Sequence, residues 1–150
     1  MATFTLISND EITTVDWQKL AILLESGGLN RRPLETLQRA FEQSQFRYLG
    51  YCDGELVATA RAISDFTSVS YLCDVAVHPH YQGRGWGKAL MERVMQDLAP
   101  LGKVFIYSVP DKIDFYQRLN FHPLLTAMVH VDEKALPVLI SSGYIPPPKI

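Results

Sequence analysis

The sequence predicts a mixed α/β sheet in which antiparallel strands come first and a strand–helix–strand unit follows. Residues 46–77 hold three strand-like runs joined by turn residues, including the hairpin signal Asp53-Gly54. Residues 69–109 read as a strand, a glycine-rich turn, an amphipathic helix and an apolar strand, which is the pattern of a parallel crossover. The 150 residues have the size of one ordinary domain, so we expect a single domain over 1–150.

Before the first hairpin, a short strand and two helices are expected. The run at 3–7 has strand composition, and the segment 14–26 carries apolar residues at a spacing of three to four, as in a helix. Two glycines then stop this first helix. Pro33, a residue favoured in the first turn of a helix, opens a second helix over 33–43.

The later elements follow from alternation, apolar stripes and turn residues. The central helix has a buried stripe that includes Leu90, Val94 and Leu98, and the strand after it is almost wholly apolar, as in parallel pairing. The predicted elements are strands at 46–52, 55–63 and 69–77, a helix at 85–98, a strand at 104–109, a short helix at 111–119 with Asn120 as its left-handed cap, a closing strand at 126–131 and an extended tail at 142–150.

Composition narrows the class of protein. The chain is 47% hydrophobic and 20% charged, which is typical of a globular domain. A net charge of −2 gives no reason to expect a nucleic-acid partner, and no apolar run approaches the roughly 18 residues of a membrane helix. The N-terminus lacks the features of a signal peptide, and the two cysteines, Cys52 and Cys73, make no disulfide framework. We therefore expect a cytoplasmic protein with free thiols and no membrane partner.

A glycine-rich stretch lies where the third strand of the meander becomes the central helix. Glycine permits a positive φ and close approach of a ligand, and the unpaired amides at a helix N-terminus attract phosphate. Residues 82–88 therefore predict a site for a phosphate-bearing molecule, the alternative being a tight turn that binds nothing. The glycines at 83, 85 and 87 are one residue short of a dinucleotide fingerprint, and Ala89 replaces the Ser or Thr of a P-loop.

What fits is the spacing [Gln/Arg]-x-x-Gly-x-[Gly/Ala], which Gln82, Gly85 and Gly87 satisfy. Residues 75–79, Val-x-Val-x-Pro, precede this motif, and residues 114–121, Asp-Phe-Tyr-Gln-Arg-Leu-Asn-Phe, follow it. In these features the chain resembles the GNAT N-acetyltransferase superfamily, whose members bind the pyrophosphate of acetyl-CoA with this motif.

The resemblance covers about residues 3–131 and implies the GNAT acyl-CoA N-acyltransferase fold. The family order is a strand, two helices, three strands, a helix, a strand, a helix and two strands. Residues 61–65, 74–77, 81–90 and 114–121 are together similar to a small bacterial and plant-chloroplast group that includes serotonin (arylalkylamine) acetyltransferases. The implied reaction moves an acetyl group from acetyl-CoA to a primary amine of a small molecule, with arylalkylamines and polyamines as candidates. No Cys/His spacing resembles a zinc site, so no metal is expected.

The resemblance also assigns the groups that hold the co-substrate. Loop amides would cradle the pyrophosphate, with charge added by Arg84 and Lys88 unless these are ordinary solvated side chains. Backbone groups of the preceding strand would pair with the pantetheine arm, and the Val75 amide would face the thioester oxygen. The expected acetyl-CoA-binding residues are Val75, Ala76, Val77, Gln82, Gly83, Arg84, Gly85, Trp86, Gly87 and Lys88.

Deprotonation of the amine suggests a role for Asp74. An alkylamine has a pKa of about 10, so a base or a water relay must remove a proton at neutral pH. Asp74 lies in an otherwise apolar strand, and strict alternation places it on one face with Leu72 and Ala76. Desolvation there would raise its pKa and suit a base. The alternatives are that Asp74 anchors the substrate or bonds to an arginine or the backbone for structure.

Protonation of the leaving thiolate suggests Tyr116. In the family a tyrosine after the last crossover strand has this role, and Tyr116 in Asp-Phe-Tyr matches it, the alternative being a core aromatic. Two departures put the fine geometry near the thiol in question. Ser108 lies where many relatives carry Asn, and Asn120 replaces the usual Gly before Phe121.

The acceptor pocket is expected between the first two helices and the strand ends. Its candidates are Leu29, Asn30, Arg31 and Arg61, with Tyr71, Phe66 or Trp17 as aromatic walls. Two alternatives stay open, namely transfer to a lysine or N-terminus of a protein, and a non-catalytic module that only binds acyl-CoA. The apolar segment 135–146 is a candidate homodimer surface, or packs on its own sheet.

Overall fold

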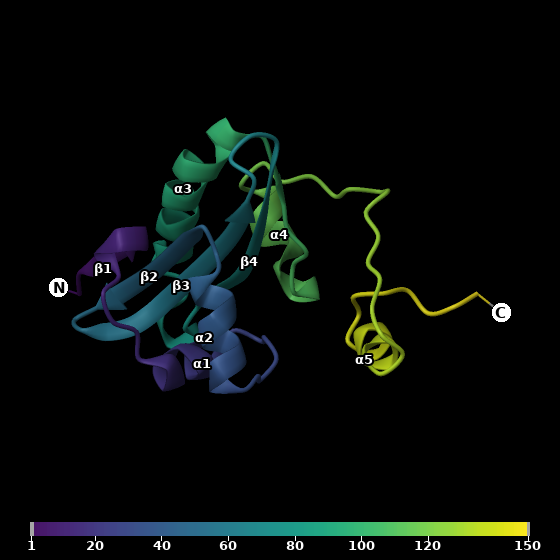
Figure 1. The fold of residues 1–150 in the computed structure, drawn as a ribbon, viewed down its shortest axis with the longest axis horizontal. Coiled ribbons are helices and arrows are strands. Elements are labelled where there is room, and N and C mark those ends of the chain that lie inside the picture. Colours follow the sequence, from purple (N-terminus) through teal and green to yellow (C-terminus); the bar gives the residue numbers. More distant parts are fainter. Residues whose placement is uncertain (1, 150) are drawn as a thin grey trace. The chain divides into compact units, whose positions relative to one another are not determined.

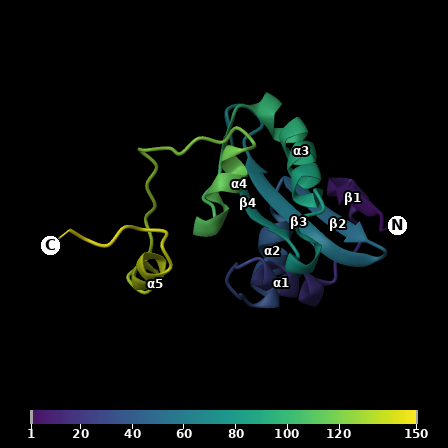
Figure 2. The same ribbon diagram turned by 180° about the vertical axis from the view of Figure 1, so that it is seen from behind.

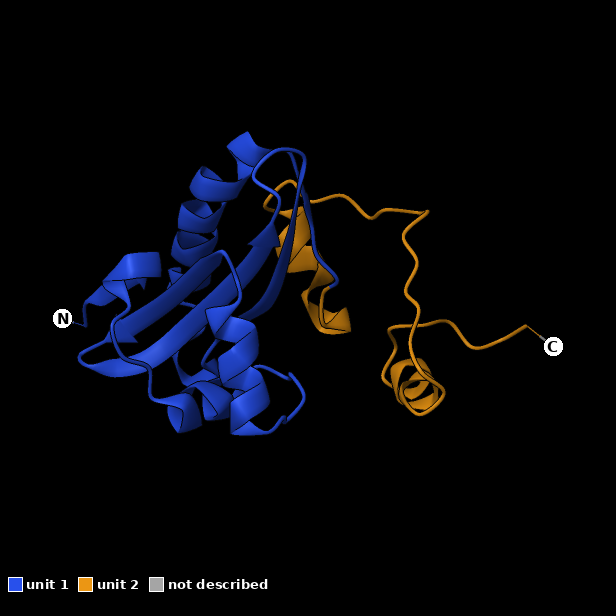
Figure 3. Cartoon of the chain, viewed as in Figure 1, with its two compact units in different colours: residues 1–107 blue, residues 108–150 orange. Residues whose placement is uncertain are grey.

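The computed structural model describes residues 2–149, and the chain divides into two compact units, residues 1–107 and 108–150 (Figure 3). Each unit is described by itself. The expectation of one domain over the whole chain stays a prediction.

A five-stranded mixed sheet is the centre of the first unit (Figure 1). Neighbouring strands follow the order of the sequence, and β1 to β4 pair antiparallel while β5 pairs parallel to β4. The strands are β1 (Phe4–Ser8), β2 (Phe46–Cys52), β3 (Glu55–Ser64), β4 (Val69–Val77) and β5 (Lys103–Phe105). The predicted mixed α/β sheet, with its meander and one parallel crossover, is confirmed.

Helices cover both faces of this sheet (Figures 1 and 2). Helices α1 (Trp17–Ser26) and α2 (Leu34–Glu42) pack on Leu49 of β2. The neighbouring residue, Tyr48, donates its hydroxyl to Asp97 of α3 (Trp86–Leu98) at 2.7 Å. Since successive side chains of a strand point to opposite faces, α3 lies on the face opposite α1 and α2.

Local sequence chemistry sets the boundaries. The Asp16 carboxylate accepts from the Lys19 amide at 3.1 Å, so α1 begins at Trp17, three residues later than predicted. Between β2 and β3, Asp53 and Gly54 both have positive φ, 49° and 82°, as the predicted two-residue turn requires.

Strand β5 is shorter than the expected 104–109, because it pairs with β4 only from Val69 to Tyr71. A bulge begins at Asp74 and bends β4 shortly beyond these pairs, and a straight parallel partner does not follow such a bend.

The second unit consists of short helices and turns. A 3₁₀ turn, Pro110–Lys112, leads into α4 (Ile113–Gln117), and α5 (Ala135–Ser141) lies within the segment considered for dimer formation. Asn120 has φ +68°, which confirms the predicted left-handed cap. The helix predicted at 111–119 is thus present but shorter.

The strand predicted at 126–131 is wrong. In the described part of the chain this segment has no strand pairing, and its first residues belong to a turn in which the Ala127 amide donates to the Leu124 carbonyl at 3.4 Å. An isolated strand leaves its backbone groups without ladder bonds, so the apolar alternation alone does not create one. The extended tail predicted at 142–150 is wrong for residues 142–145, which turn back on α5, with the Tyr144 amide donating to the Leu139 carbonyl at 2.9 Å. Residues 146–149 have no helix or strand, and residue 150 lies outside the described residues. Within residues 2–149, every helix is too short or too polar to cross a membrane.

Candidate active site

The candidate site centres on a bulge in β4. Arg61 of β3 pairs with Cys73 and Thr59 pairs with Ala76, so Asp74 and Val75 together oppose one β3 residue. Asp74 has φ +53°, the left-handed conformation found at the first position of one bulge type. A bulge re-aims the side chains and backbone amides around it.

The bulge overturns the strict alternation predicted for β4. Leu72 pairs with Ala62 and Ala76 pairs with Thr59, and these β3 partners are an odd number of residues apart. Leu72 and Ala76 therefore lie on opposite faces of the sheet, and cannot both share a face with Asp74.

One edge of β4 is open beside the bulge. Pairing with β5 ends at Tyr71, and the described residues show no further strand pairing along that edge up to Val77. An open strand edge can accept an extended ligand that carries amide groups, as an added strand would. This is the edge at which the resemblance places the pantetheine arm.

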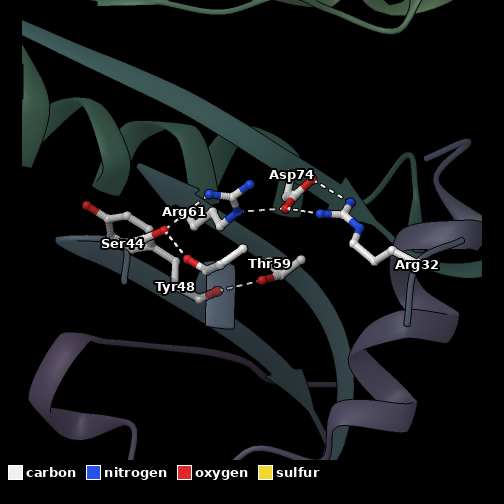
Figure 4. Close-up of polar contacts among 7 residues, drawn as sticks. Arg32, Ser44, Tyr48, Thr59, Arg61 and Asp74 are labelled. Carbon is white, nitrogen blue, oxygen red and sulfur yellow. Dashed lines mark hydrogen bonds and ion pairs between the residues drawn. The ribbon is translucent and has the colours of Figure 1, made fainter. Parts of the chain in front are cut away.

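Asp74 forms an ion-pair network with two arginines on the α1–α2 face (Figure 4). Arg32 donates from Nη1 to Oδ2 at 2.9 Å and from Nη2 to Oδ1 at 2.8 Å, while Arg61 donates from Nε to Oδ2 at 2.7 Å. The Asp74 side chain is only 12% exposed. With two guanidinium groups and one carboxylate, this group of three carries one net positive charge.

This network contradicts the raised pKa predicted for Asp74. Burial by itself raises the pKa of Asp74, but hydrogen bonds and charge from Arg32 and Arg61 outweigh burial and lower it. The hydrogen bonds to Asp74 in turn raise the pKa of Arg32. An ionised carboxylate held by three N–H donors is a poor proton acceptor. A catalytic role for Asp74 stays a prediction, but desolvation does not make it basic.

The glycine-rich loop has the backbone that its sequence predicts. Gly83 and Gly85 have φ +83° and +81°, and a Cβ on either would meet no described atom within 4 Å. Glycine is thus needed there for the left-handed backbone and leaves open space outside it. The first bond within α3 joins the Ala89 amide to the Gly85 carbonyl, so the amides of residues 86–88 have no partner of that kind. Unpaired amides at a helix N-terminus are groups that attract anions.

Side chains of the loop are ordered by contacts within the first unit. Gln82 donates from Nε2 to the Val77 carbonyl at 3.0 Å, which ties the loop to the end of β4. The Arg84 guanidinium lies 5.2 Å from the Tyr81 ring centroid and 5.4 Å from that of Trp86, and the two rings stack. These cation–π contacts hold Arg84 at the loop. Lys88 instead forms an exposed pair with Glu92 at 4.0 Å.

Aromatic side chains lie near the open edge of β4. Tyr71 and Tyr107 stack with centroids 6.3 Å apart and ring planes 10° apart. Burial, and then the neighbouring Tyr107, raises the pKa of Tyr71.

Cys73 is a free thiol whose pKa burial raises to about 11, which fits a neutral side chain rather than a nucleophile.

Tyr116 belongs to the second unit, on α4. Its ring contacts Phe115 and Phe121 edge-on, with centroids 5.1 and 5.7 Å away. Burial raises the pKa of Tyr116 to about 12, so its phenol keeps a proton at neutral pH. A proton donor needs that protonation state.

The residues expected to line the acceptor pocket make contacts in different parts of the first unit. Trp17 and Leu29 pack against the core of α1 and α2, and Phe66 contacts Phe46. Arg31 is 88% exposed and pairs with Glu25, whereas Arg32, which sequence reasoning passed over, reaches Asp74.

Comparison with known proteins decides the family, since a profile described as acetyltransferase (GNAT) family matches residues 14–121. The chain belongs to the GNAT family. An uncharacterized ycf52-like N-acetyltransferase of Prochlorococcus marinus is 35% identical over 124 residues, covering 73% of this chain and 68% of the relative. Serotonin N-acetyltransferase 2, chloroplastic, of Oryza sativa subsp. japonica is 38% identical over 100 residues, covering 63% of this chain and 50% of that relative. This GNAT chain thus spans half to two thirds of these two relatives.

A solved structure of a GNAT-family protein from Xanthomonas campestris pv. campestris superposes with a TM-score of 0.74 at 31% identity, covering 87% of this chain and 94% of that one. The GNAT fold predicted from the sequence is therefore confirmed. GNAT enzymes use acetyl-CoA as co-substrate, so the chain is an acetyl-CoA-dependent N-acetyltransferase. The roles of individual residues in this GNAT site stay predictions.

Proposed function

We propose that this enzyme acetylates the primary amine of a small molecule, with an arylalkylamine as the first candidate and a polyamine as the second. The observation that carries the proposal is the stacked pair Tyr71 and Tyr107 near the open edge of β4. Aromatic side chains offer a flat apolar surface for an aryl group. The rice relative named serotonin N-acetyltransferase 2 supports the same acceptor class.

In the proposed complex, acetyl-CoA is held by the end of β4 and by the glycine-rich loop that follows it. The amides of residues 82–88 receive the pyrophosphate at the start of α3, and Arg84 adds a charge already oriented by Tyr81 and Trp86. The open edge at Val75–Val77 pairs with the pantetheine arm. The Val75 amide, in the bulge, donates to the thioester oxygen as negative charge develops there.

The proposed reaction is direct transfer. The neutral amine attacks the thioester carbon, a C–N bond forms, and the C–S bond breaks as the tetrahedral intermediate collapses. The amine nitrogen loses a proton to water and the CoA thiolate takes one from Tyr116, whose phenol recovers its proton from solvent. The net positive charge of Arg32, Asp74 and Arg61 lowers the pKa of a nearby ammonium group and so favours the neutral nucleophile.

Release of free thiol from acetyl-CoA, measured with an amine panel, tests the proposal. We expect faster release with tyramine than with an unbranched alkylamine of similar length, and slower release with a lysine-containing peptide. The Tyr71→Ala variant should lose the preference for tyramine. Release that is fastest with the peptide would replace the proposal by a protein acceptor, and acetyl-CoA binding with no release would favour the binding module. A cytoplasmic location and a homodimer stay predictions.

A further inference from the structure

The left-handed residue of the β4 bulge is held by two arginines, one of which is in turn held by a serine. Arg32 comes from the loop between α1 and α2, Arg61 from β3, and Ser44 from the segment just after α2. Arg61 donates from Nη1 to Ser44 Oγ at 3.2 Å, and Ser44 Oγ donates to the Ala40 carbonyl of α2 at 2.7 Å (Figure 4). The contacts thus run without interruption from the α1–α2 loop to the bulge and back to α2.

The geometry is more specific than a general attraction of charges. Arg32 meets both carboxylate oxygens of Asp74 as a planar fork, which fixes the direction as well as the distance of the contact. Asp tolerates the left-handed region better than most residues, but that conformation still needs support from its surroundings. A buried ion pair is weak evidence for a contribution to stability, so its location at the bulge points instead to geometry.

We propose that Arg32, Asp74 and Arg61 are positioning residues, which we call the bulge clamp. The clamp holds the Val75 amide where it meets the thioester oxygen, and holds the α1–α2 loop where it borders the acceptor. This inference rests on the proposed function. It assigns Asp74 a structural task in catalysis, in place of proton transfer or direct binding of the amine.

Steady-state kinetics of Arg32→Gln and Asp74→Asn, with Arg39→Gln as a matched control, test the clamp. Arg39 is an exposed arginine on the neighbouring helix α2. We expect kcat/KM for the amine to fall by about 10²-fold in both clamp variants, since a misplacement of the order of 1 Å has that effect. The dissociation constant of acetyl-CoA, measured by thermal shift, should stay within about threefold, because the loop at 82–88 is separate from the clamp.

Two further variants keep the result interpretable. Because the members act as one unit, the double variant Arg32→Gln/Asp74→Asn should lose little more than either single variant. Asp74→Gly keeps a residue that favours positive φ but removes the carboxylate, and should lose activity as Asp74→Asn does. Asp74→Asn should also keep the fall in activity at acidic pH, whereas loss of that acidic limb would mean that Asp74 is the base.

Three outcomes would overturn the clamp. They are kinetics of Arg32→Gln that match those of Arg39→Gln, full activity of Asp74→Gly, and a loss confined to acetyl-CoA affinity. Failure of the proposed function is visible separately, because the unaltered enzyme would then release no thiol with any small amine. If Asp74→Asn does not fold, Arg32→Gln and its control decide, since Arg32 lies in a loop.

Discussion

Gly85 and Gly54 share one backbone conformation but lie in different loops. Their φ values are +81° and +82°, and a Cβ on either meets no described atom within 4 Å. Alanine at either position should therefore lower stability by a similar roughly 1–2 kcal/mol, the cost of a left-handed L-residue. Only Gly85→Ala should also weaken acetyl-CoA binding, because Gly85 directly precedes the helix amides that are proposed to receive the pyrophosphate.

Thermal unfolding with and without acetyl-CoA measures both effects. Each kcal/mol moves the melting temperature of a chain of this size by about 2–4 °C. Gly54→Ala is the control, with lower stability and an unchanged response to acetyl-CoA. An equal response of the two variants would mean that the loop is only a turn.

Tyr116→Phe separates proton donation from packing. The substitution keeps the ring that contacts Phe115 and Phe121 and removes only the hydroxyl. If that hydroxyl protonates the thiolate, kcat should fall by about 10²–10⁴-fold while acetyl-CoA binding survives. Because the pKa of Tyr116 is raised to about 12, the unaltered enzyme should show no loss of kcat from its ionisation between pH 7 and 10. An unchanged kcat across this range in Tyr116→Phe would remove Tyr116 from the mechanism.

Some residues of the candidate site could be predicted from the sequence, and others could not. Residue spacing predicted the left-handed glycines, because a turn motif is local. The register of the hairpin over 55–77 sets Arg61 opposite Cys73, so the pair of Arg61 and Asp74 depends on the bulge, which the sequence does not reveal. Arg32 could not be separated from Arg31, since its partner is 42 positions away and the local sequence treats both alike.

Among the elements, the turn between β3 and β4 fixes the register that places Asp74. Asp65 Oδ1 accepts from the amides of Thr67, Ser68 and Val69 at 2.9, 2.7 and 3.1 Å. Hydrogen bonds from Ser68, and then those from Thr67 and Val69, lower the pKa of Asp65 below its ordinary 3.8. Its contribution to stability is therefore complete above pH 3.8 and is lost as the pH falls through the lower folded-state pKa.

Asp65→Asn should reduce stability at pH 7, and its deficit relative to the unaltered protein should shrink below about pH 3.8. Urea unfolding at a series of pH values measures this difference. A deficit that stays constant down to pH 2 would show that the charge of Asp65 does not matter, and that the turn is held by shape alone.

Elements were predictable where local pattern and tertiary pairing agree. The bounds of β4 match the prediction because its apolar and β-branched residues, the turn before it and the proline after it all indicate the same segment. The strand at 104–109 was overestimated because its apolar composition does not say how far a bulged partner can pair. The segment 126–131 has strand-like alternation, but no sequence signal reveals whether a partner strand exists.

For the whole molecule, the features proposed to hold acetyl-CoA and the acceptor all belong to the first unit, whereas Tyr116 belongs to the second. Binding of acetyl-CoA should therefore depend on residues of the first unit alone. At a concentration one hundred times its dissociation constant, acetyl-CoA should stabilise the protein by about 2.7 kcal/mol. That corresponds to a rise of roughly 5–11 °C in melting temperature.

The same rise should appear in the full-length Tyr116→Phe and Arg32→Gln variants, because neither change touches the glycine-rich loop, and it should be reduced in Gly85→Ala. Free CoA should give a similar rise, since it carries the same pyrophosphate and the Val75 amide is proposed to act on the charge that develops during the reaction. A much smaller rise with free CoA would show that contacts to the acetyl group, and not only the pyrophosphate cradle, contribute to binding. Loss of the rise in Tyr116→Phe would instead show that the second unit takes part in binding, and that catalysis and binding are not divided between the units as proposed.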